Sequence, residues 1–468
     1  TAAIGGKDSM SGSFENLDVP PTLVSFAVTT DKTENIVSNE FKKAGNRVVL
    51  IKPDYDKNGL PDTTSLLNVY ERVTALLRSG KAVACYTPTL GGIAEAVMKM
   101  CFGNSLGFKF ADNLTANEIF GYCYGGFLLE VTENIADAAE IGEITADGKI
   151  SYNGEEIGLE RLLGIYENKL ESVYRCNKEN PKTEMQTFSY TAENRVSPAV
   201  KTAKPKVLIP VFPGTNCEYD SAKAMRDAGA EPEIFVINNR SAENVAKSVE
   251  DFANSLKTAQ MVFIPGGFSG GDEPDGSGKF ITAFFRNAAV KEQVADLLDN
   301  RDGLMCGICN GFQALIKLGL VPYGKIIDTD ENCPTLTYNT IARHQSKIVR
   351  TRIASNKSPW LADTEVGDIY SVPISHGEGR FIASDELILR LAENGQIATQ
   401  YVDENGQAAS DIHFNPNGSY YAIEGITSPD GRVFGKMGHS ERYAADLYKN
   451  VPGNYDIKMF RSAVKYFK

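Results

Sequence analysis

Residues 303–315 have the sequence GLMCGICNGFQAL, in which an apolar run ends at GICNG and a helical apolar pattern follows. Such a pattern is typical of a buried strand, a tight turn and a helix, with Cys309 at the turn. Flanking glycines leave room for a backbone that lifts the central side chain off the sheet, and a helix N-terminus favours a thiolate. The stretch therefore predicts a nucleophile elbow, although a lone cysteine is more often an ordinary buried residue.

A cysteine nucleophile needs a base within hydrogen-bond reach and a third group that orients this base. The chain contains four histidines, and two of them have a glutamate two positions later. Glu378 follows His376, and Glu441 follows His439. In either pair the carboxylate could hold one ring nitrogen while the other nitrogen faces Cys309. Spacing alone does not choose between the two histidines.

Consecutive glycines follow the strand predicted for residues 260–265, in the loop PGGFS at 265–269. Backbone N–H groups of such a loop can face a developing oxyanion, so Gly266, Gly267 and Phe268 are candidate oxyanion or substrate-binding residues. The N–H of Asn310, the residue after the cysteine, is the natural second donor. Taken alone, the glycines could equally form a plain turn.

Composition excludes several classes of function. A net charge of −12 argues against a nucleic-acid partner, and no apolar run reaches the length of a membrane span. Eight cysteines without even spacing indicate reduced thiols and a cytoplasmic protein. Cys306 and Cys309 form a C-x-x-C pair, but no second pair or histidine cluster supports a redox or zinc site.

The 468 residues are long enough for about three folding units. From residue 206 onward, strands and helices alternate, with 280–298 expected as one helix, which predicts an α/β domain with a doubly wound, mostly parallel sheet. Ligands of such sheets bind at the carboxyl ends of the strands. Before residue 166 the pattern is mixed and predicts an α+β region.

Polar residues dominate 167–205, which we interpret as a linker or a connection that lies along the surface of a domain. The chain begins at Thr1 without a methionine and inside a glycine-rich stretch, so we expect it to be a C-terminal fragment. The expected divisions are 1–31, the end of a truncated subdomain; 32–166, an α+β subdomain; the linker 167–205; and 206–468, the α/β domain.

Five segments of the second half carry a resemblance to a known family. They are 211–218 (VFPGTNCE), 265–269 (PGGFS), 307–313 (GICNGFQ), 374–380 (ISHGEGR) and 438–442 (GHSER). Together they resemble the class I (Cys-His-Glu) glutamine amidotransferase domain, in detail that of the phosphoribosylformylglycinamidine synthase family of purine biosynthesis.

The resemblance implies that Cys309, His439 and Glu441 are catalytic and that Gln313 contributes to the glutamine pocket. His376 would belong to the pocket wall rather than to the catalytic group. The family commonly has P-H-P-E-R where this chain has G-H-S-E-R, which keeps both catalytic side chains but changes the stiffness of the loop.

Two stretches before residue 166, GGKDSMSG at 5–12 and TLGGIAE at 89–95, resemble the ATP-dependent synthetase fold of the same family. The resemblance implies glutamine and formylglycinamide ribonucleotide as substrates, ATP and Mg²⁺ for the full-length synthase, and a missing N-terminal part as partner. Lys7, Asp8 and Ser9 are candidates for nucleotide or metal contact. The alternatives are an amidotransferase of another pathway, a cysteine hydrolase or peptidase of the same sheet architecture, and a non-catalytic interaction module.

Overall fold

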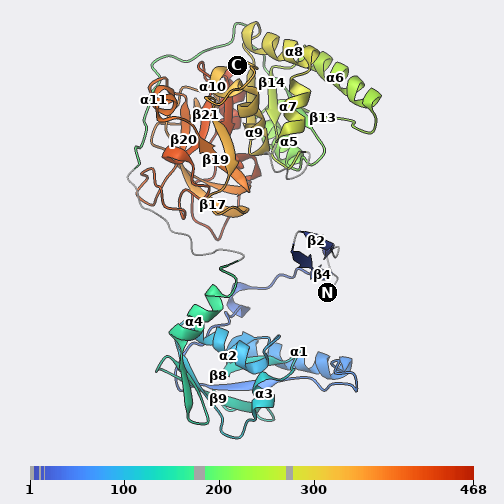
Figure 1. The fold of residues 1–468 in the computed structure, drawn as a ribbon, viewed down its shortest axis with the longest axis vertical. Coiled ribbons are helices and arrows are strands. Elements are labelled where there is room, and N and C mark those ends of the chain that lie inside the picture. Colours follow the sequence, from blue (N-terminus) through green and yellow to red (C-terminus); the bar gives the residue numbers. More distant parts are fainter. Residues whose placement is uncertain (1–4, 10–11, 15, 173–184, 270–277) are drawn as a thin grey trace. The chain divides into compact units, whose positions relative to one another are not determined.

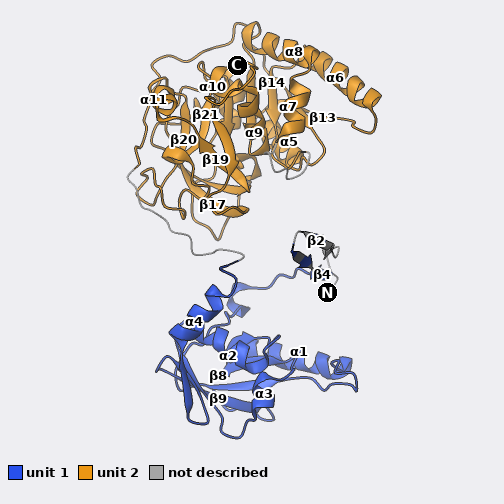
Figure 2. Cartoon of the chain, in the orientation of Figure 1, with its two compact units in different colours: residues 1–176 blue, residues 177–468 orange. Residues whose placement is uncertain are grey.

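The computed structural model describes residues 5–9, 12–14, 16–172, 185–269 and 278–468. The chain divides into two compact units, residues 1–176 and 177–468, which are coloured separately in Figure 2. Within the described ranges, no helix has the length and apolar character needed to cross a membrane.

The first unit contains a seven-stranded sheet in the order β11-β10-β7-β9-β5-β8-β6, which is antiparallel except between β7 and β10. Its strands are β5 (Arg47–Ile51), β6 (Ala82–Tyr86), β7 (Gly107–Phe110), β8 (Phe127–Val131), β9 (Ala139–Thr145), β10 (Lys149–Tyr152) and β11 (Glu155–Gly158). Its helices are α1 (Thr63–Arg78), α2 (Gly92–Phe102), α3 (Ala116–Phe120) and α4 (Leu159–Asn168). This combination agrees with the α+β pattern expected from the sequence.

The first residues of the chain form two short antiparallel pairs. Strand β1 (Gly5–Ser9) pairs with β4 (Thr22–Phe26), and β2 (Gly12–Phe14) pairs with β3 (Leu17–Val19). The candidate nucleotide or metal residues Lys7, Asp8 and Ser9 lie in β1, but their side chains are outside what the structure describes.

A nine-stranded sheet in the order β13-β12-β14-β15-β22-β21-β20-β17-β18 forms the second unit (Figure 1). Its strands are β12 (Lys206–Val211), β13 (Glu231–Val236), β14 (Met261–Ile264), β15 (Leu304–Ile308), β17 (Gln345–Ile353), β18 (Ile369–His376), β20 (Ile397–Tyr401), β21 (Ile423–Thr427) and β22 (Val433–Lys436). A separate antiparallel pair consists of β16 (Thr335–Tyr338) and β19 (Glu378–Ile382).

The sequence predicted a mostly parallel sheet, and this prediction is wrong. The sheet is mixed, with one parallel half and one antiparallel half. The strands from β13 to β22 are parallel, whereas the pairs from β22 to β18 are antiparallel. The reason is the short connection at residues 428–432 between β21 and β22, because a tight turn can join only antiparallel neighbours. The α/β class itself is observed.

The larger helices of the second unit are α5 (Glu218–Asp227), α6 (Ala242–Leu256), α7 (Lys279–Phe285), α8 (Ala288–Asp299), α9 (Asn310–Leu318), α10 (Leu320–Tyr323), α11 (Asp385–Glu393) and α12 (Met459–Tyr466). The prediction of a single helix over 280–298 is therefore wrong. The helical stretch is divided at Asn287, whose side chain accepts a hydrogen bond from the N–H of Ala289 and so begins a new helix.

Within the polar stretch 167–205, residues 185–205 follow the second of the two expectations, a connection that lies along a domain. Residues 185–205 belong to the second unit, in which Phe188 is buried and its N–H donates to Oε1 of Gln400 at 2.8 Å. The N–H of Tyr190 donates to the carbonyl of Ala354, also at 2.8 Å. Polar composition left a linker and such a connection equally open, because one aromatic side chain and backbone hydrogen bonds hold the segment.

The parallel half of the sheet positions the site. Strands β12, β14, β15 and β22 are neighbours that run in the same direction, so their carboxyl ends meet at one edge. Every residue of β14 and β15 is buried, as is typical of parallel strands covered on both faces. The segments that follow these four strands begin at Phe212, Pro265, Cys309 and Met437, and they carry the motifs predicted from the sequence.

Candidate active site

Cys309 stands between β15 and α9 with φ 53° and ψ −105°, an unusual backbone conformation for a residue other than glycine. Such strain costs about 1–3 kcal/mol and is typical of functional sites. The flanking glycines make the turn possible: a Cβ on Gly307 would lie 2.5 Å from the backbone carbon of Gly311, and one on Gly311 would lie 2.1 Å from the carbonyl oxygen of Ile264. The predicted strand, tight turn and helix are present.

His439 lies on the loop after β22, where its backbone N–H donates to the carbonyl of Pro373 at 2.8 Å. Its Nδ1 lies 2.6 Å from Oε1 of Glu441, and both side chains are buried. Since Nδ1 is engaged by the carboxylate, Nε2 is the nitrogen left for chemistry. This atom is buried and makes no hydrogen bond to a described residue.

Opposing effects set the charges of this pair. Burial alone would lower the pKa of His439, but the Glu441 carboxylate and the neighbouring thiols of Cys217 and Cys309 hold it well above its usual value. Burial would raise the pKa of Glu441, but the charge and hydrogen bond of His439 keep it below its usual value. Around neutral pH the pair is therefore an imidazolium beside a carboxylate.

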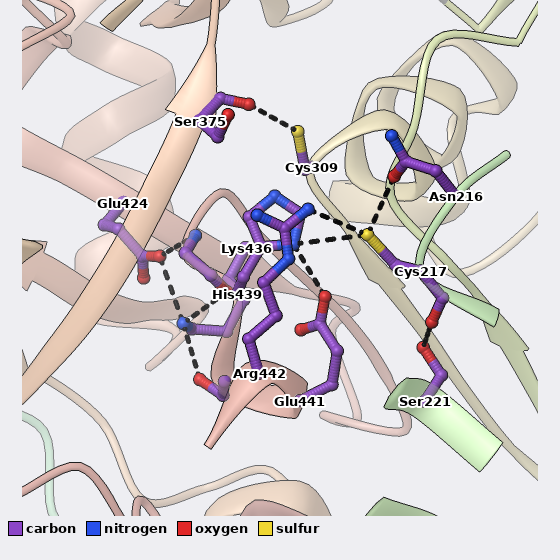
Figure 3. Close-up of polar contacts among 12 residues, drawn as sticks. Asn216, Cys217, Ser221, Cys309, Ser375, Glu424, Lys436, His439, Glu441 and Arg442 are labelled. Carbon is purple, nitrogen blue, oxygen red and sulfur yellow. Dashed lines mark hydrogen bonds and ion pairs between the residues drawn. The ribbon is translucent and has the colours of Figure 1, made fainter. Parts of the chain in front are cut away.

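A second cysteine, Cys217, lies beside this pair (Figure 3). Its Sγ is 3.8 Å from Nδ1 of His439, 3.0 Å from Oδ1 of Asn216 and 3.0 Å from Nη2 of Arg442. The ligand atoms of Cys217, His439 and Glu441 lie within 4.8 Å of one another, a spacing that could hold a metal ion. The Arg442 guanidinium already places a positive charge at the thiol, which disfavours a cation there.

The glycine loop after β14 packs directly on the histidine. A Cβ on Gly266 would lie 2.6 Å from Cε1 of His439, so only glycine fits there without movement of the ring. Gly267 has φ +142°, and a Cβ on it would lie 2.5 Å from the carbonyl oxygen of Gly214. The N–H of Phe268 donates to this same carbonyl oxygen at 2.8 Å, so it is already engaged.

Cys309 opens into a cavity of about 170 Å³. The cavity is lined by Gly267, Phe268, Cys309, Gln313, Tyr338, Ala342, Arg343, His344, His376, Gly377 and Glu378. Gln313 is buried, and its Nε2 donates to the backbone carbonyl of Glu378 at 2.5 Å. The Asn310 amide joins two sides of the cavity, since its Nδ2 donates to Gln313 and its Oδ1 accepts from the N–H of Ser269.

His376, the rival base, lines this cavity without a carboxylate on its ring. Its Nδ1 lies 3.3 Å from Oδ1 of Asn339, and its Nε2 is buried without a hydrogen-bond partner among the described residues. Burial, with smaller contributions from His439 and His344, lowers the pKa of His376 to about 3. The ring is therefore neutral around neutral pH. Cys306 lies in the strand, and burial raises the pKa of its thiol well above the usual value.

Sequence reasoning assigned no role to Cys217, which contacts His439, or to Arg442, which contacts Cys217. It also assigned none to Lys436 and Glu424, which contact the backbone of Gly438 beside His439. Cys217 and Arg442 lie inside the segments that carry the family resemblance, so their proximity to His439 could have been suspected. Lys436 and Glu424 lie outside those segments and form a buried ion pair at 3.2 Å. An ion pair between neighbouring strands leaves no signal in residue spacing.

A known protein family matches the unit that contains this site. The family described as CobB/CobQ-like glutamine amidotransferase domain matches residues 204–467, more than half of the chain. The chain belongs to this family. The glutamine amidotransferase unit is thus the second compact unit, and its alternation of strands and helices is the α/β fold that the sequence predicted at the coarse level.

Curated relatives match the amidotransferase unit over most of their own length. The phosphoribosylformylglycinamidine synthase subunit PurQ of Methanococcus maripaludis is 37% identical over 257 residues, covering 54% of this chain and 87% of that protein. The subunit of the same name from Aquifex aeolicus is 32% identical over 250 residues, covering 53% of this chain and 95% of that protein. The solved structure of PurLQS from Thermotoga maritima is 26% identical with a TM-score of 0.41, covering 57% of this chain and all of that chain.

The two PurQ subunits confirm the resemblance to the glutamine amidotransferase part of the phosphoribosylformylglycinamidine synthase family. The chain contains an enzyme unit, so the non-catalytic interaction module is excluded. The same family assignment argues against a cysteine peptidase of similar architecture.

Proposed function

We propose that the second unit hydrolyses glutamine through Cys309, His439 and Glu441, and that the ammonia is used to amidate formylglycinamide ribonucleotide. The observation that carries the proposal is the buried contact of 2.6 Å between His439 and Glu441, beside a cysteine on a strained elbow. An imidazole held at Nδ1 presents Nε2 to the nucleophile, which is the arrangement of a cysteine triad.

In the proposed reaction, the thiolate of Cys309 attacks the side-chain amide carbon of glutamine. Nε2–H of His439 gives its proton to the departing nitrogen, so that ammonia leaves and a thioester remains. The neutral Nε2 then takes a proton from water, and the resulting hydroxide attacks the thioester carbonyl. Glutamate is released and the thiolate of Cys309 is restored, with the imidazolium again beside Glu441.

Backbone N–H groups would hold the tetrahedral oxyanion. The sequence left Gly267 and Phe268 open as the loop donor, beside Asn310. Because the N–H of Phe268 donates to Gly214, we assign the loop donor to Gly267. Gln313 would act as part of the cavity wall, since its amide is already bonded to Asn310 and to the backbone of Glu378. His376 would complete this wall as a neutral ring.

The relatives support the proposed use of the ammonia, because they are named as subunits of phosphoribosylformylglycinamidine synthase. An amidotransferase of another pathway is the remaining alternative. We propose that the first unit is a piece of the synthetase part, which would use ATP and Mg²⁺. No residue with a described side chain is assigned to either of them. The rest of the synthase is the proposed partner.

The test replaces Cys309 with Ala and measures glutamate release from glutamine and synthase turnover with glutamine or ammonium salts in the full-length enzyme. We expect glutamine-dependent turnover to be lost and ammonium-dependent turnover to remain. Cys333→Ala, which alters a half-buried cysteine outside the site, is the matched control. Survival of glutamine-driven turnover in Cys309→Ala would show that the nucleophile is assigned wrongly.

A further inference from the structure

Lys436, the last residue of β22, is completely buried, and its ammonium group has three acceptors. Its Nζ lies 3.2 Å from Oε1 of Glu424, 3.0 Å from the carbonyl oxygen of Gly438 and 3.1 Å from Oγ of Ser440. The contacts with Gly438 and Ser440 are hydrogen bonds, and the contact with Glu424 is an ion pair. The acceptors include the residues immediately before and after His439.

Glu424, in β21, completes this arrangement from the opposite side. Its Oε1 accepts a hydrogen bond of 2.6 Å from the backbone N–H of Gly438, and its Oε2 accepts one from the hydroxyl of Thr399. The loop residue Gly438 is therefore held at its N–H by the carboxylate and at its carbonyl by the ammonium of Lys436.

A buried ion pair is a weak source of stability, because desolvation of the two charges offsets their attraction. The groups that the ion pair contacts indicate its role more clearly than its contribution to stability does. Glycine restricts its own backbone least of all residues, and neither 438 nor 440 is a proline, which would fix φ by itself. The loop that carries His439 therefore depends on contacts from outside for its rigidity.

We propose that Lys436 is a positioning residue for His439, and that Glu424 is retained as its charge partner. Lys436 holds the backbone on one side of His439 and the Ser440 side chain on the other, which sets the place of the imidazole relative to Cys309. The inference rests on the proposed function, in which Nε2 of His439 must transfer a proton at Cys309. A displacement of about 1 Å in such a group can cost about 100-fold in rate.

The experiment removes both charges together, because either single variant would leave one buried charge unpaired and could prevent folding. In Lys436→Met/Glu424→Gln, the glutamine oxygen can still accept from Gly438, whereas the contacts with the Gly438 carbonyl and Ser440 are lost. Glutamate release by the full chain is followed against glutamine concentration. We expect kcat to fall about 10- to 100-fold, KM to stay within about twofold, and the melting temperature to stay near that of the parent.

A purely structural role for the pair would lower the melting temperature and leave kcat of the folded protein unchanged, and this result would overturn the proposal. Ser440→Ala, which removes one contact and keeps the ion pair, should reduce kcat by a smaller factor without changing KM. Lys465→Met, on α12, serves as the control, since it breaks an ion pair between the exposed Lys465 and the half-buried Asp363, away from His439.

His439→Ala in the same assay separates the two proposals. If His439→Ala loses glutaminase activity while the double variant matches the parent, the positioning role fails and the proposed function stands. If His439→Ala is fully active, the proposed function itself fails.

Discussion

Gly266 and His439 are packed so closely that a Cβ at position 266 would lie 2.6 Å from Cε1 of the imidazole and 3.4 Å from Sγ of Cys217. The ring cannot yield freely, because Glu441 holds its Nδ1 at 2.6 Å. The glycine loop therefore supplies the surface against which the imidazole of His439 packs.

Replacement of Gly266 by Ala should move His439 away from Cys309 and lower kcat for glutamine hydrolysis by about 100-fold. Steady-state glutamate release and the circular dichroism spectrum check this expectation, since the overall fold should be retained. Gly164→Ala is the matched control, because a Cβ at this position in α4 meets no atom within 4 Å. Parent-like kcat in Gly266→Ala would contradict the seating of the imidazole on this loop.

Replacement of Glu441 by Gln keeps the shape of the side chain and removes its charge. The carboxylate is a cause of the raised pKa of His439, so this pKa should fall, and the limb of the pH–rate profile that reports His439 should move to lower pH. We expect kcat to fall at least about 100-fold, because the imidazolium loses its stabilising partner and its fixed orientation.

The measurement is the pH dependence of kcat/KM for glutamine. Glu386→Gln, at an exposed position of α11, should leave both the profile and kcat unchanged. An unshifted limb in Glu441→Gln would mean that this carboxylate does not govern the charge of His439.

His376 makes stability depend on pH. Its pKa is about 3 in the folded chain and about 6.5 in an unfolded one, so between these values the unfolded chain binds the additional proton. Stability is therefore lost as the pH falls from about 6.5 toward 3, with a slope of at most about 1.4 kcal/mol per pH unit from this group.

His376→Gln should flatten this acid dependence of stability, and urea unfolding between pH 4.5 and 7.5 measures it. The slope is compared rather than the absolute stability, because the variant also alters the contact with Asn339. Leu389→Ala, at an exposed residue without a titratable group, is the control and should keep the parent slope over this pH range. An identical slope in His376→Gln and the parent would disprove the assignment of a neutral buried ring.

The sequence alone was sufficient for features formed by neighbouring residues. The elbow at Cys309 could be predicted because a strand, a tight turn with glycines and a helix follow one another within 13 residues. Helix α6 (Ala242–Leu256) is determined locally in the same way, since it begins at a Ser241 cap and keeps one apolar face. By contrast, the end of α7 and the start of α8 depended on a single Asn287 cap within an otherwise helical pattern.

Tertiary structure decided which groups meet at the elbow. His376 and His439 both precede a glutamate by two positions, and the family resemblance favoured His439, but only the fold places a carboxylate at 2.6 Å from one ring and an amide at 3.3 Å from the other. Cys217 reaches His439 from 222 residues away.

The same holds for the pair of Lys436 and Glu424, which meet because β21 and β22 are antiparallel neighbours. The physical reason is range. Turns, caps and periodic apolar faces follow from residues close in sequence, whereas the burial, charge and distances of side chains depend on which strand ends the sheet brings to the same edge.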